Sequence, residues 1–261
     1  MSALDTDAEI LKLAHQLGVP TSRLDFLGAV PPHDLRELRS QIGEALFQAD
    51  RHQFSKVVAV SKVVPSAIAA KVTEHALSPL IAARTAELLD PPRAVDMVKR
   101  LSDRYLADVS AAMDPSRSPE VLSQIPPDRV AAVGAELARR GEWVVMGGFV
   151  SVISVEALRA AIAELTGEQL LRIGFVLDDM TRLDGIAAML TDTQLDAILA
   201  AALEHTLWRE LDELLANLDG TRPRRLAARY AAADANLRGG VDAALAAGQL
   251  SAQSAAKLAA E

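Results

Sequence analysis

Three aspartates in the second half of the chain, Asp178, Asp179 and Asp184, come closest to a metal site by type and spacing. Carboxylate oxygens are the ligands that hard divalent cations such as Mg²⁺ prefer. A structural interpretation competes, because acidic residues near the start of a helix are stabilised by the helix dipole. The spacing is not that of a calcium-binding loop. We therefore expect no cofactor other than a weakly held Mg²⁺ that is shared with water or with another chain.

A run of acidic side chains and a run of arginines follow toward the C-terminus. They consist of Glu210, Asp212 and Glu213, and of Arg222, Arg224 and Arg225, with Arg229 one turn further on. The arginines can share one face of a helix, where they could pair with the acidic segment before them or meet phosphates. We expect these residues to belong to a surface that binds a partner protein.

Val145, Met146 and Phe149 suggest a third kind of site, an apolar groove. They lie in the longest apolar run of the chain, residues 144–153, which is too short to span a membrane. On the concave face of a helical superhelix they could hold a lipid tail or a partner's amphipathic helix. Ordinary core packing is the competing interpretation.

The sequence shows no constellation of catalytic residues. Cysteine is absent, and the five histidines are scattered without ligand spacing. A nucleophile elbow, a phosphate-binding glycine loop and a zinc-protease helix are missing as well. We therefore expect a protein that is not an enzyme.

Composition narrows the class of protein further. Half of the 261 residues are hydrophobic, aromatic residues make up only 3%, and the net charge is −8. Such a chain has a substantial aliphatic core and few aromatic platforms for nucleic-acid bases, so nucleic-acid binding is not expected. Residues 153–221 hold 13 acidic side chains against four arginines. The N-terminus lacks the pattern of a secretory signal, and the sequence predicts a soluble cytoplasmic protein.

A repeat with a period of about 64 residues organises the chain. Apolar positions of residues 89–113 recur in residues 153–177, and after one inserted residue Trp143 recurs as Trp208. A fixed period of this size is typical of stacked helical units that bury their apolar faces against one another. The sequence therefore predicts an all-α fold, an α-solenoid of short helices.

The same register places Asp178 at the position of Asp114, whereas Asp179 replaces Pro115. Features that a repeat does not require are candidates for function. We therefore expect a functional face where the third unit departs from the period.

The domain organisation follows from the repeat. The sequence predicts an N-terminal helical cap over residues 1–29 with one helix at about 6–17, three repeat units over 30–217, and an alanine-rich C-terminal cap over 218–261. The units divide at 30–88, 89–152 and 153–217. In the C-terminal cap, Gly239 and Gly240 are expected to separate two helices.

Helix starts are marked by two kinds of residue. Proline pairs at 31–32, 91–92 and 126–127 precede helical patterns, and a first turn tolerates proline because its missing N–H has no helical partner there. Capping side chains mark other starts, at Ser102, Thr166, Thr191 and Asp219. The β-branched segments 57–64 and 144–153 are expected to be helical, because the repeat counterpart of the second is spaced as an amphipathic helix.

Two families share these patterns. The segment 89–94 (Leu-Asp-Pro-Pro-Arg-Ala), with Val98, Leu101, Asp108 and Val109 downstream, resembles the helical repeats of the flagellar motor switch protein FliG. The segment 176–180 (Val-Leu-Asp-Asp-Met), through Ile186, Leu190 and Leu195, resembles the N-terminal cytoplasmic domain of MgtE-type magnesium transporters. Together the resemblances cover roughly residues 60–218.

The resemblance implies a right-handed superhelix of short helices with an interaction or regulatory role. In the transporters, acidic residues of this domain help to bind the magnesium that holds the channel shut. The nucleotide-binding modules and the channel that follow it there are not part of this sequence, so we expect any such role to require a partner protein.

Together these observations predict a non-catalytic cytoplasmic scaffold that binds another protein and responds to a divalent cation. The partner could be a membrane protein or a second copy of the chain in a homo-oligomer, without direct membrane insertion. The alternative is a protein that binds an apolar small molecule or a lipid in a groove between units.

Overall fold

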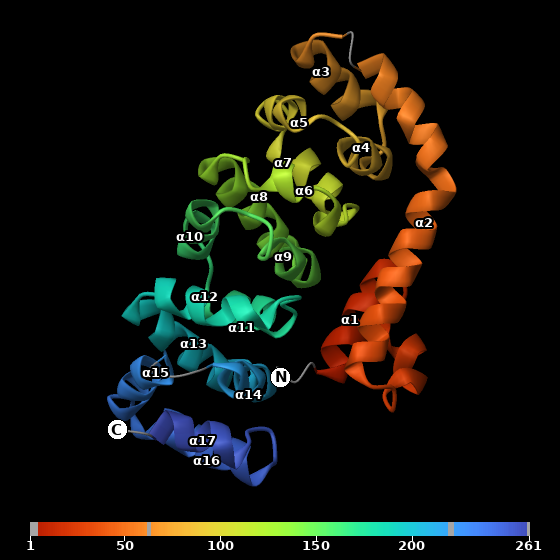
Figure 1. Ribbon diagram of the computed structural model, residues 1–261. Coiled ribbons are helices and arrows are strands. Elements are labelled where there is room, and N and C mark those ends of the chain that lie inside the picture. Colours follow the sequence, from red (N-terminus) through yellow and green to blue (C-terminus); the bar gives the residue numbers. More distant parts are fainter. Residues whose placement is uncertain (1–4, 62–63, 219–221, 260–261) are drawn as a thin grey trace. The chain divides into compact units, whose positions relative to one another are not determined.

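The computed structural model describes residues 5–61, 64–218 and 222–259, with the backbone alone for residues 47, 49–61, 222 and 223. These residues form seventeen α-helices and three short 3-10 helices, and no strand occurs among them (Figure 1). The predicted all-α fold class is confirmed. The chain divides into two compact units, residues 9–164 and residues 165–261 together with 1–8.

The unit of residues 9–164 is built from helices that contact one another at every second position. Helices α2, α4, α6, α8 and α10 pack in succession, and α3, α5 and α7 form a second succession beside them. The elements are α1 (Thr6–Leu17), η1 (Thr21–Leu27), α2 (Pro32–Ser61), α3 (Ser66–Ala76), α4 (Pro79–Ala86), α5 (Pro91–Val98), α6 (Asp103–Ala111), η2 (Pro115–Arg117), α7 (Pro119–Leu122), α8 (Pro127–Arg140), α9 (Trp143–Phe149) and α10 (Val155–Ala163).

Helix α1, predicted at these residues, is held on α2 by apolar packing and by one buried carboxylate. Leu13 and Leu35 are at most 1% exposed in a small core between the two helices. Glu9 is also 1% exposed. Its carboxylate forms ion pairs with the side-chain nitrogens of Lys12, Arg36 and Arg39 at 3.0, 3.2 and 3.3 Å. A buried charge requires such partners, because its desolvation is otherwise costly.

The unit of residues 165–261 has the same alternating succession. Helices α11, α13, α15 and α17 pack one on the next, α14 contacts α11 and α17, and α16 contacts α13. The elements are α11 (Gly167–Phe175), η3 (Met180–Arg182), α12 (Leu183–Met189), α13 (Asp192–Glu204), α14 (Trp208–Asn217), α15 (Arg222–Ala231), α16 (Ala235–Ala246) and α17 (Ala252–Ala259).

The order of elements from α5 to α9 recurs from α10 to α14. Helix α6 begins at residue 103 and α11 at residue 167, while η2, α8 and α9 begin 65 residues before η3, α13 and α14. The two tryptophans, Trp143 and Trp208, are each the first residue of their helix. The period seen in the sequence therefore corresponds to a recurring order of helices.

Three helices each carry an arginine that forms a hydrogen bond just before the start of the α-helix two earlier in the chain. Arg93 on α5, Arg129 on α8 and Arg225 on α15 donate to the carbonyls of Val64, Leu101 and Leu190 at 2.6, 2.5 and 3.0 Å. Each carbonyl lies two residues before the first residue of the helix it precedes. In α6 and α13 that first residue is an aspartate, Asp103 or Asp192, which pairs with the same arginine. These contacts fix the position of one helix against another.

Most predicted helix starts are confirmed. Helices α2, α5 and α8 begin at a proline of each predicted pair. The side chains of Ser102, Thr166 and Thr191 accept backbone N–H bonds at the starts of α6, α11 and α13, and the two threonines form complete capping boxes. Asp219, the fourth predicted cap, lies outside the described residues.

The predicted break at Gly239 and Gly240 is wrong. Both glycines lie inside α16, which begins after Asp234. A Cβ atom at Gly240 would meet Leu203 Cδ1 at 2.5 Å and the Trp208 ring at 3.1 Å. Gly240 therefore permits close packing of α16 rather than ending a helix.

The two β-branched segments are helical over most of their length. Helix α2 continues to Ser61, beyond which residues 62–63 lie outside the described residues. Helix α9 ends at Phe149, and residues 150–153 form turns and a bend, so the helix expected at 144–153 is shorter than predicted.

Candidate functional site

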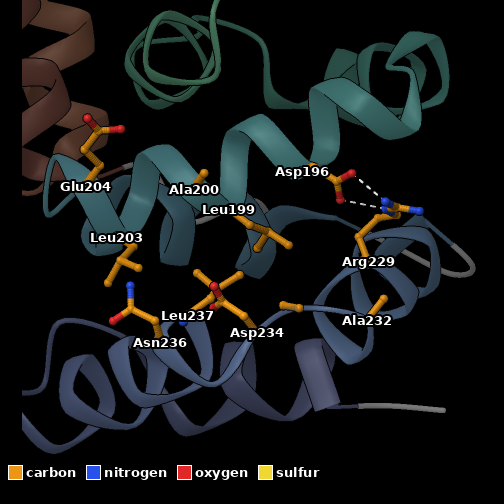
Figure 2. Close-up of a pocket in the computed structure, with 11 residues that line it drawn as sticks. Asp196, Leu199, Ala200, Leu203, Glu204, Arg229, Ala232, Asp234, Asn236 and Leu237 are labelled. Carbon is orange, nitrogen blue, oxygen red and sulfur yellow. Dashed lines mark hydrogen bonds and ion pairs between the residues drawn. The ribbon is translucent and has the colours of Figure 1, made fainter.

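An open groove lies between α13, the end of α15 and the start of α16, within the unit of residues 165–261 (Figure 2). Its volume is about 610 Å³, within the range of about 300–1,000 Å³ that is typical of ligand sites. Its lining is formed by Asp196, Leu199, Ala200, Leu203, Glu204, Arg229, Ala232, Ala233, Asp234, Asn236 and Leu237.

The floor of the groove is apolar. Figure 2 shows Leu199 and Leu203 extending from α13 toward α16, where Leu237 lies opposite them. Leu199 is 1% exposed and Leu237 is 9% exposed, so both belong to the core beneath the groove. The start of α16 is fixed by Asp234, whose carboxylate accepts the Leu237 N–H at 2.9 Å. A partner would therefore meet the half-buried Leu203 and the exposed Ala200, which lie above this core.

One end of the groove is closed by an ion pair. The Arg229 guanidinium donates to both carboxylate oxygens of Asp196, at 2.6 and 2.5 Å. These hydrogen bonds lower the pKa of Asp196 and raise the pKa of Arg229. Both groups are therefore charged at neutral pH, and their charges largely compensate each other.

The rest of the rim is acidic. Glu204 at the other end of α13 is exposed, and no hydrogen bond or ion pair joins it to another described residue. Asp234 on the opposite wall is exposed as well and is bound only through one oxygen to the start of its own helix. The lining therefore carries, besides the Asp196–Arg229 pair, two carboxylates that no ion pair joins to another side chain described in the structure.

The groove coincides with a change in residue size between repeat units. Helix α8 carries Gly134 and Ala138 where α13, 65 positions later, carries Leu199 and Leu203. A Cβ atom at Gly134 would meet the Ala161 Cβ of α10 at 3.8 Å, so α8 and α10 approach closely. The larger leucines of α13 require more distance from the helices packed on it. The sequence signal for the groove was thus leucine in place of glycine and alanine within the repeat.

Asp179 has a structural role that the sequence register concealed. Its carboxylate accepts the N–H and the hydroxyl of Thr181, at 3.0 and 2.6 Å, at the start of η3. Asp114 accepts the same two groups from Ser116, also at 3.0 and 2.6 Å, at the start of η2. The counterpart of Asp114 is therefore Asp179, and the correspondence with Asp178 was wrong by the one inserted residue.

The three predicted metal ligands are not gathered into a cluster. Asp184 lies in the first turn of α12, and Asp178 and Asp184 both take part in other interactions. Among the side chains that the structure describes, no three of His, Cys, Asp or Glu are arranged to hold a metal ion. Binding of Mg²⁺ at Asp178, Asp179 and Asp184 stays a prediction.

The acidic run on α14 is divided between different surroundings. Asp212 accepts the N–H and the hydroxyl of Ser251, at 2.9 and 2.7 Å, before α17. Glu213 is half-buried and accepts a hydrogen bond from Asn217 at 3.0 Å. Burial raises the pKa of Glu213, and the nearby carboxylates of Asp5 and Asp212 raise it further. Glu210 is half-buried in the first turn.

The arginines of α15 meet the acidic segment, one of the two alternatives expected for them. Arg225 pairs with Asp192, and Arg229 with Asp196, on α13. Arg224 is exposed, and the side chain of Arg222 lies outside the described part of the chain. Two members of the predicted cluster therefore hold α15 against α13.

The apolar groove predicted at Val145, Met146 and Phe149 is not open at these positions. Val145 and Met146 are 7% and 9% exposed, and Phe149 is half-buried. The core-packing interpretation accounts for the first two, because a buried side chain is not available to a ligand. An open groove lies on α13 instead.

Comparisons with protein-family models, with curated proteins and with solved structures give no match. None of the described helices combines the length and the apolar character needed to cross a membrane.

Proposed function

We propose that the protein is a non-catalytic cytoplasmic scaffold, a right-handed superhelix of short helices that binds a segment of another protein. The recurring order of helices and their packing at every second position support the superhelix. The observation that carries the function is the open groove of about 610 Å³ on α13.

The groove has the composition of a protein-binding site. Its apolar floor can take the side chains that anchor a partner, and its polar rim can orient them. An amphipathic helix laid in a groove between helices is a common mode of peptide recognition. The small side chains of Ala200, Ala232 and Ala233 along the lining leave room for a backbone to approach.

Affinity capture from the cells that express the gene tests this function. Ala200 is exposed and lines the groove, so Ala200→Trp should fill the groove without disturbing the core. Leu245 on the same unit is 40% exposed and does not line the groove, which makes Leu245→Trp the matched control. We expect a specific protein to be retained by the wild type and by Leu245→Trp and to be lost from Ala200→Trp. Equal retention by all three proteins contradicts binding at this groove.

The same groove favours a second candidate function, the binding of an apolar small molecule. Its volume and its apolar lining, with Leu203 half-buried, suit such a ligand. Native mass spectrometry of the purified protein distinguishes the two functions. A bound lipid-sized mass that Ala200→Trp removes supports this second function, and an unliganded mass contradicts it.

A further inference from the structure

The charge of the groove restricts the kind of segment that can bind there. Among the lining residues, three carboxylates stand against one guanidinium. Arg229 is committed to Asp196 through two hydrogen bonds, so it does not compensate Glu204 or Asp234. An acidic occupant would bring a further negative charge to this rim, and like charges at an interface oppose binding.

The carboxylates of the lining lie close to its apolar residues along the chain. Asp196 and Glu204 lie eight residues apart on α13, a separation of about 12 Å along a helix axis. Leu199 and Leu203 lie between them on the same helix, with Asp234 and Leu237 on the facing wall (Figure 2). Apolar anchors beside Leu203 would therefore lie between Asp234, across the groove, and the end of α13, where the Glu204 side chain extends on the side away from α16 (Figure 2).

We infer that the segment bound in this groove is a cationic amphipathic segment of a partner protein, with aliphatic side chains against Leu203 and the alanines of the lining and with lysine or arginine beside Glu204 and Asp234. The inference rests on the proposed function. Pairing at the exposed rim contributes mainly to specificity and to the rate of association, while the apolar anchors provide most of the affinity.

Two fluorescent peptides of about 15 residues, long enough to form a helix when bound, test the inference with the full chain. One carries leucines at spacings of three and four and lysines elsewhere, and the other carries glutamates in place of the lysines. We expect fluorescence anisotropy to show binding of the lysine peptide and at least tenfold weaker binding of the glutamate peptide.

Charge reversal locates the interaction. Glu204→Lys should weaken binding of the lysine peptide about tenfold, whereas Asp242→Lys should change it less than twofold. Asp242 is exposed on α16 and does not line the groove, so the control changes the net charge of the protein equally. Thermal melts of both variants check that they are folded.

The outcomes separate the inference from the proposed function. Equal binding of the two peptides, or equal effects of Glu204→Lys and Asp242→Lys, overturns the cationic segment. If the glutamate peptide binds as well as the lysine peptide and Ala200→Trp abolishes both, the inference fails while binding at the groove stands. If a partner is captured equally by the wild type and by Ala200→Trp, the proposed function fails instead.

Discussion

Gly167 permits a close approach of two helices, whereas Gly185 lies in open space and makes no such contact. Gly167 begins α11, and a Cβ atom there would meet the backbone oxygen of Ala197 on α13 at 2.1 Å. Backbone cannot yield as a side chain does, so the helices would have to separate. Gly185 lies inside α12, and nothing lies within 4 Å of the position of its Cβ.

Alanine at these two positions should have opposite effects. We expect Gly167→Ala to destabilise the protein by about 1–3 kcal/mol or more through overpacking. Gly185→Ala should leave stability unchanged or raise it by up to about 1 kcal/mol, because alanine has the higher helix propensity. Urea unfolding measures both changes. Equal stability of the two variants would contradict the close approach of α11 and α13.

Glu213 should make the stability of the protein depend on pH. Burial raises its pKa in the folded chain, so the folded state binds a proton more tightly than the unfolded state does. Its contribution to stability is therefore greatest at acid pH and is lost as the pH rises through the folded pKa.

We accordingly expect Glu213→Gln to melt at a higher temperature than the wild type at neutral pH. The difference should shrink as the pH falls toward the ordinary glutamate pKa of about 4.3. Glu210→Gln on the same helix is the control and should show no such gain. A wild type that melts above Glu213→Gln at pH 7 is the contrary result.

Among the secondary-structure elements, α8 carries two arginines that differ in whether they contact another helix. Arg129 of α8 reaches the carbonyl of Leu101 and the carboxylate of Asp103, and its side chain is 20% exposed. Arg139 of the same helix pairs only within α8, with Glu136, and its side chain is 70% exposed. Arg129 therefore joins α8 to α6, whereas Arg139 makes contacts only within α8.

Methionine in place of each arginine should reveal this difference. We expect Arg129→Met to cost about 1–3 kcal/mol, because it leaves a half-buried carbonyl without its donor. Arg139→Met should stay within about 1 kcal/mol of the wild type, as surface ion pairs usually do. Chemical denaturation of the two variants provides the comparison, and equal losses would show that the arginine does not hold α6 and α8 together.

Much of the element order was predictable because its signals are local. Prolines and capping threonines lie at helix starts, and the repeat predicted that Trp143 and Trp208 occupy equivalent positions. The wrong predictions concerned residues whose roles depend on contacts that the local sequence does not show. Gly240 resembled a helix breaker until its packing against Leu203 and Trp208 was known. Similarly, Asp179 resembled a departure from the repeat until its bonds to Thr181 gave the true register.

On the scale of the whole molecule, function is expected where the repeat changes rather than where it is kept. The groove lies at such a change, with Leu199 and Leu203 at positions that are glycine and alanine in the preceding unit. The sequence shows this change of residue size, but it does not show a groove, because a groove depends on how far apart two helices are held. Periodicity therefore predicted the all-α fold class, while the candidate site required the packing of α13, α15 and α16.

Site-specific photo-crosslinking tests the central claim, that the groove on α13 binds a partner protein, most directly. A photoreactive amino acid replaces Ala200 in one variant and Leu245 in the other, both in the cells that express the gene. We predict a crosslinked partner from position 200 and none from position 245, with a cationic amphipathic peptide of that partner attached at position 200. Crosslinks of equal yield from both positions, or none from position 200, would contradict the proposal.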